Sequence, residues 1–284
     1  MLRIAVPNKG TLSETAVDML REAGYAVRRD PKELIVSDPR NDVEFFYLRP
    51  RDIATYVGAG ALDVGVTGRD LLLDSHSAAA EVDAFDFGAS TFRFAGPTGR
   101  FTKVGDLAGL RVATSYSALV GDFLEAEGVR ATVVHLDGAV ESAVRLGVAD
   151  AVADVVETGS TLRTQGLEIF GPVILESTAV LIATRESERS ERVEGLETFR
   201  RRLQGVMVAR RYVLMDYDLP ADLLEKASTI TPGFESPTVS PLRDTGWLAV
   251  RVMVPRDDTN DVMDRLYALG ARAILVSSIH AARI

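Results

Sequence analysis

Acidic and hydroxyl-bearing residues gather in one short stretch, DVVETGSTLR, at positions 154–163. Asp154 lies in an apolar run, ADAVADVV (149–156), that predicts a buried strand, and TLRTQG (161–166) is typical of a helix start. Backbone N–H groups at a helix N-terminus bind phosphate, hydroxyls add hydrogen bonds, and glycine lets the backbone approach closely. The candidate phosphate ligands are Thr158, Gly159, Ser160 and Thr161.

Asp154 cannot bind the phosphate itself, because a carboxylate repels it. Its oxygens suit the hydroxyls of a sugar, or a magnesium ion beside the phosphate. The stretch therefore predicts a phosphorylated sugar as the ligand. An alternative stays open here, since Thr158 or Ser160 would equally serve as a helix cap. The stretch is neither a Walker A loop nor a G-x-G-x-x-G pattern.

The elements that must position these residues alternate between strands and helices. LRIAV (2–6) predicts a strand followed by an amphipathic helix, and LRVAT (110–114) repeats this start later in the chain. GVADAVAD (147–154) likewise echoes GALDVGVT (60–67). We expect two related α/β lobes with parallel strands, whose ligands bind beyond the carboxyl ends of those strands. The expected core is two-lobed and of the periplasmic-binding-protein type.

Cations follow the predicted strand ends of the first lobe. Lys9 lies in the PNKG turn, and Arg49 and Arg51 follow VEFFYL (43–48). They are candidate ligands for phosphate groups, and Arg51 is the weakest of the three, because an arginine after a strand is often a surface salt-bridge partner. Asp70 follows a third predicted strand, LDVGVTG (62–68), and would otherwise act as a helix cap.

The C-terminal part of the chain has a different order of predicted strands and helices. RESERSERVEGLETFRRRL predicts a charged helix, and residues 206–211 either prolong it or begin a strand. Strands are then predicted at YVLMDY (212–217), near PTVSPL, at WLAVRVMVP (247–255) and at ARAILVSSI (271–279), with two helices between them. This β-α-β-β-α-β order is ferredoxin-like.

Composition excludes several classes of function. The 284 residues contain no cysteine, which rules out disulfides and thiolate catalysis, and the three histidines lack metal-ligand spacing. A formal net charge of −9 argues against nucleic-acid binding. No apolar run is long enough to span a membrane, and the N-terminus lacks signal-peptide features, so we expect a cytoplasmic protein without a membrane partner.

A longer pattern surrounds the phosphate stretch. From Glu141 to Leu162 the chain reads E-x5-G-x-A-x2-V-x-D-V-x2-T-G-x-T-L, which resembles the signature of the ATP phosphoribosyltransferases. PNKG, GVTGRDLL (65–72) and TPGFESPTVSPL (231–242) resemble the same family, the last segment its long form with a regulatory domain. The resemblance covers essentially the whole chain. Thr11, where many members carry arginine, and Glu157 depart from it.

The resemblance implies a glycosyltransferase that joins ATP to phosphoribosyl pyrophosphate (PRPP), the first step of histidine biosynthesis. It implies Mg²⁺ as cofactor, feedback inhibition by histidine and a homo-oligomer in dimer–hexamer equilibrium. The implied organisation is an α/β fold with catalytic lobe I at 1–90 and 179–211, catalytic lobe II with the PRPP loop at 91–178, and a ferredoxin-like α+β regulatory domain at 212–284.

The resemblance also implies roles for individual residues. Lys9, Arg49, Glu141 and Asp154 would be catalytic, and Glu141 and Asp154 would approach the metal, which PRPP itself mainly holds. PRPP would contact Asp154, Val155, Glu157, Thr158, Gly159, Ser160 and Thr161. ATP would contact Lys9, Gly10, Arg49, Asp70 and Tyr116. Histidine would contact Asp218, Thr238 and Ala273.

Other interpretations of the same residues remain at this point. Glu141 would serve as a first-turn acid that complements a helix dipole, Tyr116 as a half-buried core aromatic, and Thr238 as a loop cap. At the scale of the chain, two lobes also describe a solute-binding protein, and the C-terminal module also suits a pure ligand sensor. Turnover of ATP with PRPP would separate an enzyme from both.

Overall fold

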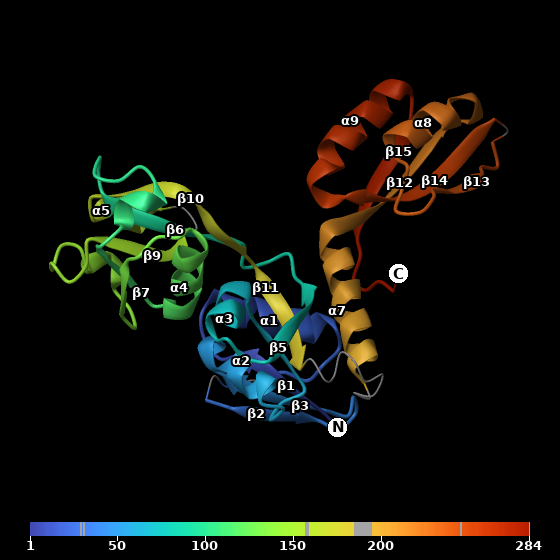
Figure 1. The fold of residues 1–284 in the computed structure, drawn as a ribbon. Coiled ribbons are helices and arrows are strands. Elements are labelled where there is room, and N and C mark those ends of the chain that lie inside the picture. The colour runs from blue at the N-terminus through green and yellow to red at the C-terminus, as the bar shows by residue number, and fades with distance from the viewer. Residues whose placement is uncertain (29, 31, 157–158, 185–194, 245, 284) are drawn as a thin grey trace. The chain divides into compact units, whose positions relative to one another are not determined.

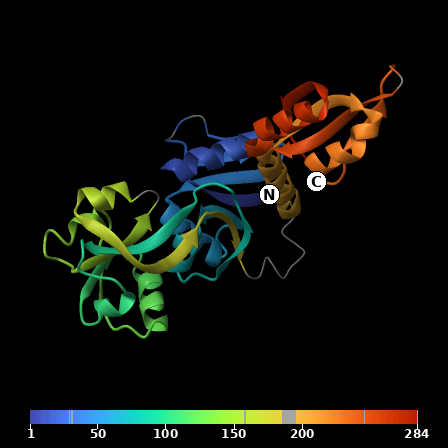
Figure 2. The ribbon, with the colours of Figure 1, turned by 90° about the horizontal axis from the view of Figure 1, so that it is seen from above.

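We describe a computed structural model of the chain, which covers all residues except 29, 31, 157–158, 185–194, 245 and 284. Its residues form two compact units, one of Met1–Asp18 with Tyr25–Leu196 and the other of Met19–Gly24 with Glu197–Ile284. Figures 1 and 2 show the ribbon from two directions. Each unit is described by itself.

The first unit contains two mixed sheets, and the six-stranded one has the order β2-β3-β1-β4-β11-β5. Its core strands β1, β3 and β4 run parallel, whereas β11 is antiparallel to both β4 and β5. Apolar residues of β1, including Ile4, Ala5 and Val6, are fully buried, as expected of a central parallel strand. The elements of this lobe are β1 (Leu2–Pro7), α1 (Thr11–Glu22), β2 (Ile35–Asp38), β3 (Val43–Leu48), α2 (Pro50–Gly58), β4 (Val64–Gly68), α3 (Arg69–Asp74), β5 (Ala79–Ala84) and β11 (Ala179–Thr184).

The second sheet of this unit has the order β10-β6-β9-β7-β8. Strand β7 is parallel to β8 and β9, and β6 is antiparallel to β9 and β10. The chain passes between the two sheets twice, after β5 and after β10. The elements here are β6 (Ser90–Pro97), the 3-10 turn η1 (Val104–Leu107), β7 (Arg111–Thr114), α4 (Ser117–Ala126), β8 (Thr132–His135), the 3-10 turn η2 (Val140–Ser142), β9 (Ala151–Val156), α5 (Ser160–Thr164) and β10 (Leu167–Ser177).

The similarity between the two lobes in sequence is matched by an equivalent hydrogen bond in each lobe. In the first lobe Asp63 accepts a hydrogen bond from the backbone N–H of Arg3, at 2.7 Å. In the second lobe Asp150 accepts the equivalent bond from the N–H of Arg111, at 3.0 Å. Each aspartate precedes a central strand and binds the start of the strand beside it. The two lobes are therefore built on the same local arrangement.

The C-terminal unit is an antiparallel sheet of order β13-β14-β12-β15 that carries two helices. Val213, Met215, Tyr217 and Leu219 alternate along β12 and are buried in the core with residues of α8 and α9. This order is that of a ferredoxin-like β-α-β-β-α-β module. Its elements are α7 (Leu196–Arg211), β12 (Tyr212–Pro220), the 3-10 turn η3 (Ala221–Leu223), α8 (Leu224–Ile230), β13 (Thr238–Pro241), β14 (Trp247–Pro255), the 3-10 turn η4 (Arg256–Asp258), α9 (Thr259–Leu269) and β15 (Arg272–Ser278).

Helix α7 resolves the ambiguity at residues 206–211, because it continues to Arg211 and the strand begins only at Tyr212. Phe199, Leu203 and Val206 form its buried side. Arg210 of this helix donates two hydrogen bonds of 2.9 Å to Glu22 near the end of α1. The preceding charged segment, with Val193, lies outside the described residues.

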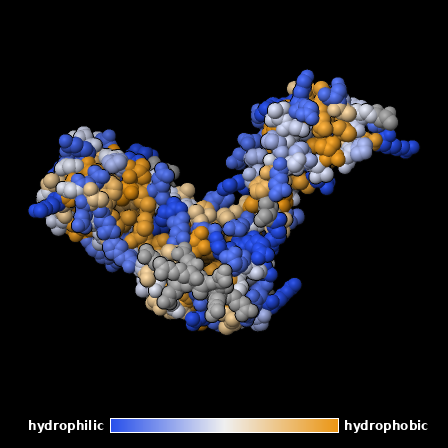
Figure 3. Space-filling view, turned by 45° about the vertical axis from the view of Figure 1, so that its right-hand side comes forward, coloured by the Kyte–Doolittle hydropathy of each residue, from blue (hydrophilic) through white to orange (hydrophobic). Residues whose placement is uncertain are grey.

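The predicted fold class is confirmed: two α/β lobes are followed by a separate antiparallel α+β unit. The expectation of parallel strands holds only for the central strands, because β2 and β11 run antiparallel to their neighbours in one sheet and β6 in the other. On the face in Figure 3, apolar residues (orange) gather in patches within a mostly hydrophilic surface. No helix within the described ranges is long and apolar enough to cross a membrane.

Candidate active site

Three candidate residues follow neighbouring parallel strands of the first lobe. Arg49 follows β3, Lys9 follows β1 and Asp70 follows β4, and β1 lies between the other two strands. The N–H of Asn8 donates to the carbonyl of Leu48 at 2.8 Å, which joins the ends of β1 and β3. Since parallel strands end at a common edge, the sheet brings two cations and one acid to one edge.

Lys9 and Arg49 are exposed, and neither forms an ion pair with any residue that the structure describes. Arg49 has an extended backbone, with φ −63° and ψ 133°, immediately before Pro50 begins α2. Gly10 turns the chain towards α1 with φ 79°, in the left-handed region that favours glycine. Both cations are thus available to an anionic ligand.

Asp70 is a buried acid, with 7% of its surface exposed. The Ser177 hydroxyl donates to its Oδ1 at 2.9 Å and accepts from its backbone N–H at 3.1 Å. Asp70 lies at the start of α3, where a carboxylate also complements the helix dipole. The helix-cap interpretation of the sequence is therefore incomplete, because the carboxylate is held by a distant strand.

Tyr116 comes from the second lobe, at the residue before α4. Its ring packs edge-on against Phe92, with the two ring centroids 5.0 Å apart. The guanidinium carbon of Arg51 lies 4.7 Å from the centroid of the Tyr116 ring. Burial raises the pKa of Tyr116 far above its ordinary value, and the carboxylate of Asp70 adds to this effect. The tyrosine and Asp70 therefore share one site, although they belong to different lobes.

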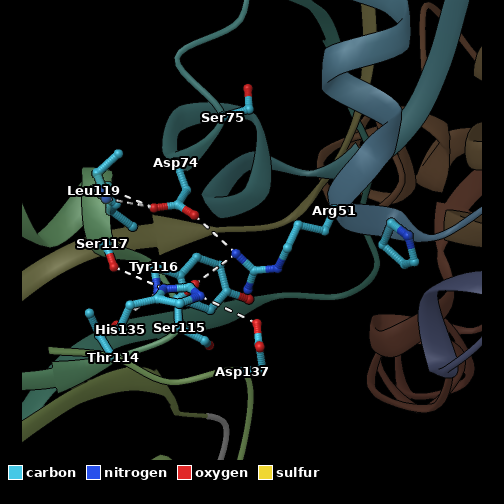
Figure 4. A network of polar contacts seen from close by, with 12 residues as sticks. Arg51, Asp74, Ser75, Thr114, Ser115, Tyr116, Ser117, Leu119, His135 and Asp137 are labelled. Carbon is cyan, nitrogen blue, oxygen red and sulfur yellow. Dashed lines mark hydrogen bonds and ion pairs between the residues drawn. The ribbon is translucent and has the colours of Figure 1, made fainter.

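Arg51 connects the lobes through the network in Figure 4. Its Nη1 donates to the carbonyl of Ser115 at 2.7 Å and to Asp74 at 3.0 Å. Asp74 in turn accepts from the N–H groups of Ala118 and Leu119, at 3.0 and 3.2 Å, at the start of α4. Arg51 is thus more than a surface salt-bridge partner.

Asp154 and Glu141 complete the acidic side of the site. The pKa of Asp154 is raised chiefly by burial, and the neighbouring charges of Glu141 and Asp70 raise it further, whereas Arg51 opposes them. Glu141 lies on η2, which begins after Ala139 in a left-handed conformation with φ 50°. A non-glycine residue there is costly, and such strain is often found at functional sites.

The predicted phosphate loop is described in part. Val155 donates its N–H to Asp154 at 2.8 Å, and Gly159 has φ 68° and precedes α5. Ser160 and Thr161 form the exposed first turn of that helix. Glu157 and Thr158 lie outside the described residues.

The C-terminal domain and the central part of the chain both match one known family. Residues 49–205 match the family described as HisG, ATP phosphoribosyltransferase, and residues 209–281 match the HisG C-terminal domain. The chain belongs to the ATP phosphoribosyltransferase family. It is therefore a phosphoribosyl transferase of the glycosyltransferase class, in its long form, that acts at the first step of histidine biosynthesis.

Full-length relatives agree with this assignment. The chain is 64% identical over 286 residues to the ATP phosphoribosyltransferase of Arthrobacter sp. (strain FB24), with 100% of both chains covered. It is 59% identical over 285 residues to that of Streptomyces coelicolor, again with 100% of both covered. Among solved structures it is similar to a chain of the ATP phosphoribosyl transferase (HisG:HisZ) complex from Thermotoga maritima, with 29% identity, a TM-score of 0.64, and coverage of 73% of this chain and 98% of that one.

The three histidines of this phosphoribosyltransferase are exposed. His135 contacts Ser117 at 3.0 Å and Asp137 at 3.3 Å, which is superficially like a hydrolase triad. Asp74 already accepts from the N–H groups after Ser117, so they cannot form an oxyanion hole there. The trio therefore does not suit acyl transfer.

The residues predicted to bind histidine all lie on the ferredoxin-like sheet. Asp218 pairs with Arg272 across β12 and β15, beside a bulge where Ala273 has φ 49°. Asp218 makes no side-chain ion pair with a described residue. Thr238 is on β13, and β14 separates it from β12. Within one chain, Asp218 and Ala273 are therefore neighbours and Thr238 is not.

Sequence reasoning ranked Arg51 as the weakest cation and did not identify Asp74 or Ser177. Arg51 follows a strand closely enough to be suspected. No sequence signal connects Ser177 with Asp70, because 107 positions separate them and the contact depends on strand β10 reaching the first lobe. The tertiary structure therefore adds Asp74 and Ser177 to the site and shows that Arg51, already a candidate, contacts both lobes.

Proposed function

We propose that the protein transfers the phosphoribosyl group of PRPP to N1 of the adenine of ATP, which yields phosphoribosyl-ATP and pyrophosphate. Catalysis would lie in lobe I (1–90 and 179–211) and lobe II (91–178), and regulation in residues 212–284. One observation carries the assignment of the site: Asp70, Tyr116 and Arg51 share a site with Asp154, which lies just before the phosphate loop.

Each part of the site suits a part of the two substrates. Gly159, Ser160 and Thr161 offer backbone N–H groups and hydroxyls to the 5-phosphate of PRPP, together with Val155, Glu157 and Thr158 of the same loop. Asp154 and Glu141 would accept hydrogen bonds from the ribose hydroxyls. Asp70 and Tyr116 would contact adenine, and Lys9, Gly10 and Arg49 the phosphates of ATP or the leaving pyrophosphate.

The reaction requires little covalent chemistry from the protein. Adenine N1 carries its own lone pair, so the N1–C1 bond forms as the bond from C1 to the pyrophosphate oxygen breaks, through an oxocarbenium-like state. The residues would contribute alignment of two anionic substrates and stabilisation of the departing charge. Carboxylates near C1 would favour the positive charge that develops on the ribose.

Mg²⁺ fits the donor chemistry of the acidic pair. Carboxylate oxygens are its usual protein ligands, and the mutual repulsion that raises the pKa of Asp154 would be relieved by a cation. The described residues contain no group of three or more metal-ligating side chains. We therefore assign most of its coordination to PRPP, with Glu141 and Asp154 nearby. Bound magnesium would neutralise the charge of the leaving pyrophosphate.

We further propose that histidine inhibits the enzyme from the C-terminal unit. Asp218 is a half-buried carboxylate that would accept from the ligand's amino group or imidazole, and Ala273 lies beside it. Thr238 would come from a neighbouring subunit, because β14 separates it from Asp218 within the chain. We also propose a homo-oligomer in dimer–hexamer equilibrium, as the family resemblance implies.

A direct assay tests the reaction. The full chain is incubated with ATP, PRPP and Mg²⁺ while pyrophosphate release and the ultraviolet spectrum of adenine are followed. Release of one pyrophosphate for each altered adenine supports the proposal. Binding of both substrates without turnover would instead favour a ligand-binding or sensor protein and would overturn it.

A further inference from the structure

Ser177 holds an acid from a distant part of the chain by two hydrogen bonds. It ends β10, just before the chain returns to the first lobe, and 6% of its surface is exposed. Its hydroxyl donates to Oδ1 of Asp70 at 2.9 Å and accepts from the N–H of Asp70 at 3.1 Å. Because the same hydroxyl binds backbone and side chain, it restricts rotation of the carboxylate.

Gly68 provides the space for this orientation. A Cβ at position 68 would collide with Oδ1 of Asp70. The backbone of Gly68 is extended, with φ −83° and ψ 145°, so glycine is not required by conformation. Its absence of a side chain instead allows the carboxylate to fold back against the start of α3.

The arrangement places a carboxylate where its burial is costly. Asp70 is 7% exposed, and it belongs to no ion pair formed among the described residues. The hydroxyl of Tyr116, from the other lobe, is a second hydrogen-bond donor to this carboxylate beside Ser177. The two oxygens of a carboxylate accept about four hydrogen bonds, so these two donors leave room for a further one. A ligand amino group would supply it.

We propose that Ser177 is a positioning residue that sets the specificity of the site for the 6-amino group of adenine. The inference rests on the proposed function, in which Asp70 contacts adenine. An amino group donates to a carboxylate, whereas a base without that group leaves one acceptor position of the carboxylate without a donor. When N1 bonds to C1 and pyrophosphate departs with the electron pair, adenine gains positive charge that extends to the amino group. A fixed carboxylate therefore stabilises the transition state more than the ground state.

The test combines a change in the protein with a change in the substrate. Parent and Ser177→Ala enzymes are assayed with ATP and with the purine analogue of ATP that lacks the 6-amino group but keeps N1. For the parent we expect loss of the amino group to lower kcat/KM by about 10- to 100-fold. In Ser177→Ala we expect kcat/KM with ATP to fall by a similar factor. The additional fall in kcat/KM when the analogue replaces ATP should be several-fold smaller than in the parent.

Two matched variants separate positioning from support of the strand. Ser177→Thr keeps the hydroxyl and should restore the preference for the amino group. Thr178→Val removes the neighbouring hydroxyl, which donates to the carbonyls of Phe85 and Phe87 at 2.8 Å but does not bind Asp70. It should leave the penalty for the analogue as in the parent. Should the alanine variant not fold, Ser177→Cys replaces it in the same comparison.

The outcomes are distinct. Equal penalties for the analogue in parent and Ser177→Ala would overturn the role of Ser177 while leaving the reaction intact. The same loss of preference in Thr178→Val would also overturn it, because any disturbance of the strand would then suffice. A parent that makes no product from ATP and PRPP would instead refute the proposed function.

Discussion

At the scale of single residues, the three carboxylates of the candidate site have different surroundings. Asp70 is fixed by Ser177, and Glu141 lies on a short 3-10 turn. Asp154 is half-buried, and its pKa is raised by desolvation and by the other two charges. The raised pKa shows that ionised Asp154 is a cost to the folded protein. We therefore expect this acid to serve ligand binding rather than stability.

Asp154→Asn should separate binding from stability. The amide keeps an acceptor for the N–H of Val155 but removes the charge, so kcat/KM for PRPP should fall by about 10- to 100-fold. Steady-state kinetics with varied PRPP and Mg²⁺ would measure this, with ATP saturating. Loss of folding without a specific PRPP defect would show that the acid is structural.

The same substitution makes a prediction about pH. Because the folded-state pKa of Asp154 lies above the unfolded one, its contribution to stability is present below the unfolded value and is lost as pH rises through the folded value. At neutral pH Asp154→Asn should therefore melt at the same temperature as the parent or higher. This advantage should vanish below about pH 4. An Asp154→Asn variant that melts at a lower temperature than the parent at pH 7 would contradict the predicted direction of this effect.

Thr161→Ala tests the phosphate loop. Thr161 is exposed in the first turn of α5, so removing its hydroxyl should spare the fold. A lost hydrogen bond to a charged group would raise the KM for PRPP by about 10-fold or more. Thr164→Ala is the matched control, because its hydroxyl binds the carbonyl of Thr161 on the same helix. If the KM for PRPP is the same in both variants, Thr161 acts only as a helix cap.

At the scale of elements, the site depends on how closely α2 approaches β4. A Cβ on Gly65 would lie 2.5 Å from Cγ2 of Ile53 and 3.1 Å from Cγ2 of Val57, and both side chains are fully buried. Helix α2 carries Arg51 in its first turn, and β4 leads to Asp70. The small residue thus sets the distance between two elements that supply the site.

Gly65→Ala should lower the free energy of unfolding by about 1–3 kcal/mol, because an added methyl group overpacks this contact. Gly121→Ala in α4 is the control, since nothing lies within 4 Å of a Cβ there. It should gain about 0.5–1 kcal/mol from helix propensity. Urea denaturation of both variants measures the difference, and a neutral Gly65→Ala would mean that α2 can shift without cost.

At the scale of the whole molecule, the catalytic and C-terminal parts make separable predictions. Asp218→Ala in the full chain should raise the histidine concentration for half-inhibition by about 10-fold or more, with turnover unchanged in its absence. Asp216→Ala is the control on the same strand face, because Asp216 pairs with Arg251 at 2.7 Å. If histidine inhibits Asp218→Ala as strongly as the parent, Asp218 does not contact histidine and the proposed site is wrong.

A chain that ends after Arg211 should lose inhibition by histidine and keep measurable transfer. It retains α7, whose Arg210 pairs with Glu22 at 2.9 Å, so this helix keeps its contact with α1. Turnover with and without histidine, on samples checked by gel filtration, measures both properties. Persistent inhibition would place the regulatory site in the catalytic lobes.

Local patterns of the sequence were enough for many of the elements and for the order of the lobes, although strands such as β6 and β10 were not predicted. Alternating apolar residues and the repeat of LRIAV in LRVAT predicted the α/β halves, and VEFFYL and WLAVRVMVP match β3 and β14 residue for residue. The boundary at Arg211 was ambiguous because VMVA fits both a helix face and a strand. Burial against neighbouring elements, which the sequence does not show, settled it.

The spacing from Glu141 to Leu162 likewise predicts the acids and the phosphate loop, since those residues are close along the chain. Tertiary structure alone decided which distant residues meet them. The return of β10 brings Ser177 to Asp70, and Arg51 crosses to Ser115 and Tyr116. Such contacts depend on the register of strands and the path between lobes, whereas a sequence motif records only neighbours along one segment. The sequence by itself therefore predicts the phosphate loop, and the orientation of Asp70, the acid that we propose to face adenine, is a property of the fold.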